Sequence, residues 1–118
     1  MRNTGPSPQI RDQVKERDGN ACRRCRRAPA TQIHHRAPRA AGGSKNCDWI
    51  NNPANLVLVD DQCHAYIESH RARAYETGWL IRRTSDDLPE EVPLTDVYGA
   101  RFVLDDEGGI TYITKGTP

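Results

Sequence analysis

The side chains best suited to chemistry in this 118-residue chain are cysteines and histidines that occur in one short stretch. The stretch carries a Cys-x-x-Cys pair at 22–25, a His-His pair at 34–35 and a Cys-His pair at 63–64. Thiolate and imidazole are preferred zinc ligands, and imidazole also exchanges protons near neutral pH. The pattern therefore predicts metal binding combined with proton transfer.

The cysteine count alone leaves two chemistries open. Four cysteines could pair as disulfides in a secreted protein. The N-terminal sequence has no apolar run of signal-peptide length, and no window approaches the roughly 18 apolar residues of a membrane span. We therefore expect a cytoplasmic protein with reduced thiols and no membrane partner. There a Cys-x-x-Cys pair is half of a zinc site or a redox pair, and the redox alternative needs a strand before it and a helix after it.

Size and composition indicate one domain with a small core. At 13.3 kDa the chain can remove roughly two-thirds of its unfolded surface from water. Only 36% of the residues are hydrophobic, the mean hydropathy is −0.82, and eight prolines and nine glycines interrupt periodic patterns. We expect something besides apolar burial to stabilise the fold.

Charge is distributed unevenly along the chain, although the formal net charge is only +1. Residues 1–83 hold fifteen Lys and Arg against eight Asp and Glu, whereas residues 84–118 hold two against eight. Between Gly19 and Cys47 there are seven basic residues and no acidic one. A cationic surface beside a metal centre suits a polyanion such as DNA, and an ordinary solvated face is the alternative.

Short regular elements are expected around these side chains. Ser7 and Pro8 predict the start of a helix that ends at Gly19, with Ile10 and Val14 on one face. The next expected elements are a strand at 31–35, an extended loop at 37–53, a strand at 56–59, and a helix from Cys63 to Thr77 that ends at Gly78.

The acidic end of the chain predicts a β-hairpin. Residues 79–81 are a short apolar run, and residues 84–93 read as an acidic linker without periodicity. Two strand-like segments at 100–104 and 110–113 flank a turn that contains two glycines. The hairpin packs on the preceding domain, mimics the charge of DNA, or binds a protein partner, and the sequence leaves these three roles open.

The order of a strand with His34 and His35, a loop, Asn55, a second strand and a helix starting at Cys63-His64 resembles the ββα-metal finger of the HNH endonuclease family. The flanking cysteines resemble the zinc-stapled branch that is common among bacteriophage proteins. The resemblance covers about residues 10–83. It implies an α+β fold: a small ββα-metal (His-Me finger) HNH domain with an N-terminal helix, a structural zinc site and a C-terminal β-hairpin. The chain then divides into a disordered lead-in at 1–8, an HNH nuclease domain at 9–83 and an acidic C-terminal extension at 84–118.

The resemblance implies a metal-dependent DNA endonuclease that hydrolyses phosphodiesters. His35 would be the general base, and His34 and His64 would bind a divalent metal, which could be Mg²⁺, Mn²⁺, Ni²⁺ or Zn²⁺. Glu68 lies one helical turn after His64 and could be a third ligand. Asn55 would either ligate the ion or fix the loop through hydrogen bonds to the backbone. The cleavage would be nicking or double-strand cutting: a monomer should nick DNA, because so small a finger spans one phosphate at a time, and double-strand breaks would require two copies.

A structural Zn²⁺ would be bound by Cys22, Cys25 and Cys63, and the fourth ligand is open. Cys47, from the long loop, is favoured over Asp60 because structural zinc sites prefer thiolate. The third alternative is that no zinc is bound.

The resemblance also implies DNA as a partner. The residues expected to contact it are Arg23, Arg24, Arg36, Arg39 and Lys45. Further basic residues that could reach the DNA backbone are Arg71, Arg73, Arg82 and Arg83. His70 is about 240° around the helix from His64, so we expect it to contact phosphate or to cap the helix.

Phage HNH proteins of this size often lie beside the packaging terminase, so the resemblance implies terminase as a second partner and the host cytoplasm as the location. Two other classes of protein compete with this interpretation. One is a catalytically inactive zinc-stapled DNA- or protein-binding module, which would not need His35. The other is a redox or metal sensor built on Cys22 and Cys25, which would need neither Asn55 nor His64.

Overall fold

Helix α1 (Pro8–Asp18) opens the part of the chain that the computed structural model describes, which is residues 5–38, 49–82 and 86–114. The Ser7 side chain accepts a hydrogen bond from the Ile10 N–H at 3.2 Å, and Pro8 follows at the first helical position. Gly19 has a left-handed φ of 67° and ends the helix. The predicted helix and both of its end signals are confirmed.

Two short strands follow and pair with each other. Strand β1 (Gln32–His35) is antiparallel to β2 (Leu56–Val59), and His34 lies opposite Val57. A 3-10 turn, η1 (Pro53–Asn55), leads directly into β2, whose four residues are all buried. The strands predicted at 31–35 and 56–59 are confirmed to within one residue.

The prediction of one continuous helix from Cys63 to Thr77 is wrong, because the structure has two helices there. Helix α2 (Asp61–Ser69) begins after Asp60, whose side chain accepts from the Cys63 N–H, and α3 (Arg71–Glu76) follows a break at His70. At the break, the Ser69 hydroxyl and the His70 ring both approach the carbonyl of Tyr66, which also accepts the His70 N–H. Side chains that compete for a backbone carbonyl weaken a regular helix at that point.

The acidic end forms a second antiparallel sheet in the order β3-β4-β5. The predicted hairpin is confirmed as β4 (Arg101–Leu104) and β5 (Ile110–Thr114). The sequence did not predict the two-residue strand β3 (Leu94–Thr95), which pairs with β4, nor the 3-10 turn η2 (Pro89–Glu91).

The second sheet is part of the main core and is not a free tail. The Trp79 ring meets Phe102 edge to face at a centroid distance of 6.4 Å, and the indole N–H donates to the carbonyl of Thr95. Leu94 and Leu104 are buried in the same cluster as Val57 from β2. Of the three roles left open for the acidic segment, packing on the preceding residues is the one that the structure shows.

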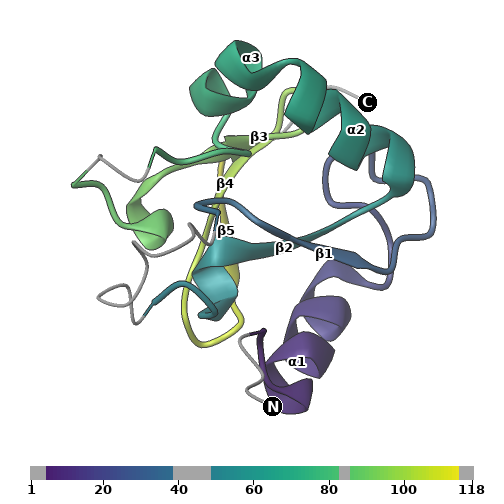
Figure 1. Ribbon diagram of the computed structural model, residues 1–118, viewed down its shortest axis with the longest axis vertical. Coiled ribbons are helices and arrows are strands. Elements are labelled where there is room, and N and C mark those ends of the chain that lie inside the picture. The colour runs from purple at the N-terminus through teal and green to yellow at the C-terminus, as the bar shows by residue number, and fades with distance from the viewer. Residues whose placement is uncertain (1–4, 39–48, 83–85, 115–118) are drawn as a thin grey trace.

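The elements form a small α+β protein with helices and two antiparallel sheets. In Figure 1, α1 lies at one end of the molecule, α2 and α3 lie at the other, and the β1–β2 pair lies between them. Within the described ranges, every helix is too short and too polar to cross a lipid bilayer.

Candidate metal centres

The loop after α1 turns its cysteines toward the interior. An isolated bridge joins Ala21 to Pro29, and the Cys22 N–H donates to Ala28 O at 2.8 Å. Arg26 closes the turn with a left-handed φ of 66° and donates its N–H to Cys22 O. These backbone contacts therefore orient both thiols without the help of a metal ion.

Four side chains form the first cluster, which we call the cysteine cluster: Cys22, Cys25, Asp60 and Cys63. Their candidate ligand atoms all lie within 4.8 Å of one another, so they could bind one metal ion such as zinc. Asp60 Oδ2 lies 3.5 Å from Cys25 Sγ, while Oδ1 caps α2. Cys47, the favoured fourth ligand, lies outside the described residues, and the structure brings Asp60, the alternative, into the cluster.

The surroundings of the cysteine cluster lower the pKa of Asp60 and Cys25 and raise the pKa of Cys63. Burial raises the pKa of Asp60, but hydrogen bonds from Cys63 and Cys25 outweigh it, so the net pKa is below its ordinary value. Burial likewise raises the pKa of Cys25, and backbone hydrogen bonds from Ala28 and Arg27 bring the net value below the usual one. Burial raises the pKa of Cys63 to about 12, although Arg24 donates to its sulfur at 3.3 Å. A bound cation would oppose this last shift by favouring the thiolate.

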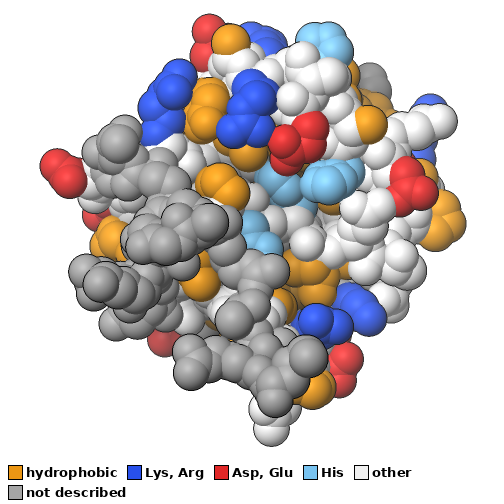
Figure 2. Space-filling model, viewed as in Figure 1, with side chains coloured by type: hydrophobic (Ala, Val, Ile, Leu, Met, Phe, Trp, Pro, Cys, Tyr) orange, Lys and Arg blue, Asp and Glu red, His pale blue; other side chains and the backbone are white. Residues whose placement is uncertain are grey.

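The second cluster, which we call the histidine cluster, consists of His34, His64 and Glu68. Its candidate ligand atoms also lie within 4.8 Å of one another. His34 is buried on β1, whereas His64 and Glu68 face solvent one turn apart on α2, with His64 Nε2 4.0 Å from Glu68 Oε2. Histidine side chains gather near the middle of the face drawn in Figure 2.

A backbone carbonyl sets the tautomer of His34. Its Nε2 lies 2.7 Å from Trp79 O, and a carbonyl can only accept, so Nε2 carries the hydrogen and Nδ1 carries the lone pair. Burial lowers the pKa of His34 to about 4, so the ring is neutral at pH 7. A neutral imidazole whose second nitrogen donates to a carbonyl is the usual state of a metal-binding histidine.

His35 is not a member of the histidine cluster, and as the next residue on β1 it is expected to leave the opposite face of the strand from His34. Its Nε2 lies 2.8 Å from Asn51 Oδ1. If that amide oxygen accepts, Nε2 carries the hydrogen and Nδ1 is the basic nitrogen of the neutral ring. The structure thus separates the two adjacent histidines, with His34 in the cluster and His35 beside it.

Asn55 is fully buried and bridges the two ends of the long loop. Its Oδ1 accepts from the Ala37 N–H at 2.8 Å, and its Nδ2 donates to Ala37 O and Ile50 O. Of the two roles open to this residue, these contacts match the one that fixes the loop.

Arg36 was predicted to contact DNA, and this prediction is wrong. The side chain is fully buried and donates to four carbonyl oxygens: Gly78 O, Ala54 O, Pro89 O and Val92 O. Burial lowers its pKa to about 9, so the guanidinium stays charged at neutral pH. Its role is to join the histidine-bearing strand to the acidic segment.

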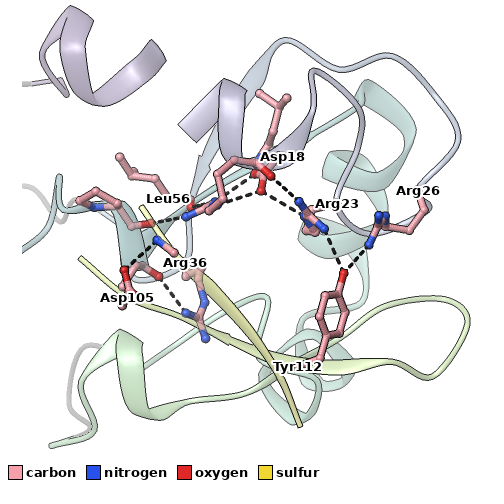
Figure 3. A network of polar contacts seen from close by, with 12 residues as sticks. Asp18, Arg23, Arg26, Arg36, Leu56, Asp105 and Tyr112 are labelled. Carbon is pink, nitrogen blue, oxygen red and sulfur yellow. Dashed lines mark hydrogen bonds and ion pairs between the residues drawn. The ribbon is translucent and has the colours of Figure 1, made fainter. Parts of the chain in front are cut away.

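Arg23 is also internal, so its predicted DNA contact is wrong as well. Its Nε donates to Asp18 Oδ1 at 3.0 Å, and its Nη1 donates to the Tyr112 hydroxyl. Arg26 donates to the same hydroxyl, so Tyr112 of β5 joins two arginines of the cysteine loop (Figure 3). Asp18 also accepts the Leu58 N–H and therefore ties α1 to β2.

The other predicted DNA contacts divide between surface and undescribed residues. Arg24 is half-buried, with its guanidinium 4.1 Å from the centroid of the Tyr66 ring. Arg71 forms an ion pair with Glu68, and His70 stacks on Tyr66 away from the histidine cluster. Arg39, Lys45 and Arg83 lie outside the described residues.

Sequence reasoning missed two groups that orient the histidines. The Asn51 side chain lies in a run of asparagines before a proline, a pattern that indicates only a turn. Trp79 acts on His34 through its carbonyl, and a backbone atom leaves no signature in residue type. Gly78 just before it has a φ of 86°, and a Cβ there would collide with Pro93 O, so this turn admits only glycine.

Together, the fold and the clusters define a small α+β protein with a cysteine-aspartate cluster that could bind a metal such as zinc. Comparison of the chain with protein-family models, with curated proteins and with solved structures found no match. The chemistry of this chain is therefore inferred from its own geometry.

Proposed function

We propose that this chain is a metal-dependent DNA endonuclease of the HNH class, with β1, β2 and α2 as its ββα-metal finger. The observation that supports this most directly is the histidine cluster on β1 and α2, with His35 next to it on the same strand. Metal-binding imidazoles with an imidazole base beside them can together hydrolyse a phosphodiester.

The histidine cluster would hold a divalent cation such as Mg²⁺, Mn²⁺, Ni²⁺ or Zn²⁺ through His34, His64 and Glu68. When bound, that cation supplies positive charge to offset the charge that grows on the phosphate and the leaving oxygen. His34 is held neutral by burial and oriented by Trp79 O, which is the preparation that a metal ligand needs.

His35 would be the general base. Its contact with Asn51 fixes the plane of the ring and directs the proton-accepting nitrogen, Nδ1, away from the amide. That nitrogen would take a proton from the water that attacks phosphorus, which is the role of a general base. Asn55 would support His35 indirectly by holding the loop that carries Asn51.

The cysteine cluster would have a structural role. A closed set of four ligands leaves no position for water or substrate, whereas a set of three leaves positions open. Zinc bound by Cys22, Cys25, Asp60 and Cys63 would fasten the cysteine loop to the start of α2, which also carries His64.

The test measures cleavage of supercoiled plasmid in the presence of Mg²⁺, Mn²⁺ or Ni²⁺. Each reaction is repeated with the ion removed by a chelator and again after the ion is added back. We expect nicked circles as the first product, and a loss of rate of roughly 10²- to 10⁴-fold in His35→Ala. His70→Ala is the matched control, because it removes an exposed imidazole outside the histidine cluster and should cut at the wild-type rate. Unchanged cutting by His35→Ala, or none by the wild type with any of the three ions, would overturn the proposal.

A zinc-stapled binding module without catalysis is the second candidate. It is favoured by the separation of the two clusters, because the cysteine cluster could staple the fold whether or not the histidines bind an ion. The same plasmid assay separates the candidates, since a pure binding module would shift the mobility of DNA and leave it uncut.

A further inference from the structure

A cavity of about 240 Å³ lies beside His35, on the face of β1 that His35 shares with Ile33. Helix α1 and the segment just before it supply the other lining residues. The lining residues are Gly5, Pro6, Arg11, Lys15, Thr31, Ile33 and His35.

The wall contributed by α1 is cationic. Arg11 and Lys15 are four residues apart, so they project from one side of the helix. Among the described residues, neither side chain takes part in an ion pair. The surface carboxylates of α1, on Asp12 and Glu16, line a different hollow on the helix. The cavity therefore faces two positive charges that no described acidic side chain neutralises.

We infer that Arg11 and Lys15 bind a DNA phosphate beside the scissile one, an inference that rests on the proposed endonuclease function. A lysine supplies a compact point charge and an arginine a planar fork of donors, and both suit phosphate oxygens. The volume is below the roughly 300–1,000 Å³ of sites for drug-sized molecules, so a single phosphodiester group suits the cavity better than a small-molecule cofactor does.

The surface agrees with a strand of DNA that crosses the histidines. Figures 1 and 2 share one view: basic side chains lie over α1 on one side of the central histidines and near α2 and α3 on the other. A backbone held at the α1 end would run past His35 toward the histidine cluster. Arg11 and Lys15 would then be positioning residues that act on substrate binding.

Such residues should affect KM and the salt dependence of binding more than kcat. Each phosphate contact contributes roughly 0.9 to the slope of log binding constant against log salt for duplex DNA. A contact made equally in the ground state and the transition state changes KM and leaves kcat alone.

The experiment compares wild type with the double variant Arg11→Gln/Lys15→Gln by fluorescence anisotropy on a short labelled duplex across a salt series, and by cleavage kinetics. We expect the salt slope to fall by about 1.8, KM to rise at least tenfold and kcat to stay within threefold. The swap Arg11→Lys/Lys15→Arg keeps both charges and should restore most of the binding. Thermal unfolding should be alike in all variants, since both residues are on the surface of α1.

Arg101→Glu is the matched control. It changes the net charge by the same two units on an exposed position of β4. The inference is overturned if this control lowers the salt slope as much as the α1 double variant does, or if the double variant binds like wild type. If the double variant binds like wild type, while wild type cuts DNA and His35→Ala does not, the phosphate subsite is wrong and the endonuclease proposal stands. If wild type binds DNA without cutting, the binding arm still decides the subsite, and only the endonuclease falls.

Discussion

The cysteine cluster and the histidine cluster share helix α2 but differ in chemistry and exposure. The first gathers three thiols and a carboxylate, with Cys22 and Cys63 buried. The second gathers two imidazoles and a carboxylate, and the side chains of His64 and Glu68 are 39% and 47% exposed. A complete set of four ligands suits an ion that stays bound, whereas an open set of three suits an ion that must meet water and substrate.

The two clusters diverge at consecutive residues. Cys63 and His64 both lie in the first turn of α2, about 100° apart around the helix axis. One turn of helix therefore directs one ligand into the core and the next toward the surface. If the comparison is right, the two clusters should respond to mutation in different ways.

Removal of a thiol should have the largest effect. Cys22→Ser should release zinc and unfold the chain, because structural zinc contributes roughly 10 kcal/mol or more to the folding of small zinc domains. His64→Ala should keep the zinc and the fold while losing metal-dependent cleavage. Zinc stoichiometry and circular dichroism measure both. A folded Cys22→Ser protein without zinc would show that the cysteine cluster is not a structural site.

The next effect concerns the loop beside the histidine cluster. Asn55→Ala would leave three buried backbone groups without partners, at a cost of roughly 3–5 kcal/mol of unfolding free energy. Asn55→Asp keeps the acceptor for the Ala37 N–H, but its second carboxylate oxygen would face two carbonyl oxygens in a buried site, so we expect it to destabilise at least as much as Asn55→Ala. Urea unfolding of zinc-loaded protein gives both values. The loop-fixing role would be wrong if Asn55→Ala were as stable as wild type.

His34 should make the fold sensitive to acid. Burial lowers its pKa to about 4 from an ordinary 6.5, so the folded chain binds this proton more weakly than the unfolded chain does. The contribution to stability is complete above pH 6.5 and is lost as the pH falls toward 4, by roughly 3 kcal/mol in total. The unfolding free energy of wild type and of His34→Gln, compared across this pH range without added divalent metal, isolates the contribution of His34. Parallel curves for the two proteins would contradict it.

The smallest predicted effect tests whether Asp60 is the fourth ligand of the cysteine cluster. Asn caps a helix about as well as Asp, so Asp60→Asn should leave α2 intact and change thermal stability little in metal-free protein. Loss of the carboxylate should weaken zinc binding by about tenfold, near 1.4 kcal/mol, as measured by competition with a chromogenic chelator. Asp60→Cys should strengthen it. Identical zinc affinity in all three proteins would exclude Asp60 as a ligand.

Much of the framework could be predicted because its signals are local. Ser7, Pro8 and Gly19 bound α1 through contacts within four residues of the chain, and the apolar run at 56–59 could fit only a buried element. The grouping of cysteines and histidines was also visible, because their spacing in the sequence is short. Which of them lie close enough to share an ion, however, depends on how distant segments pack together.

The errors come from contacts between distant residues. Arg36 resembles any surface arginine in sequence, and its four carbonyl partners come from segments up to 56 residues away. Arg23 is internal because Asp18 and Tyr112 are placed on either side of it by separate elements. Strand β3 is too short to show periodicity, and it exists because Leu94 and Thr95 pair with β4.

The Tyr112 hydroxyl that joins Arg23 and Arg26 has a consequence for the order of folding. The contact spans 89 residues, and Gln13 of α1 meets Glu107 across 94. Links between such distant parts of a chain form late, since a large loop must close first. On a ribosome, the cysteine and histidine clusters would emerge well before β5, the strand that holds the cysteine loop. Newly made chains would therefore pass through a stage in which the thiols are present and their loop is not yet secured.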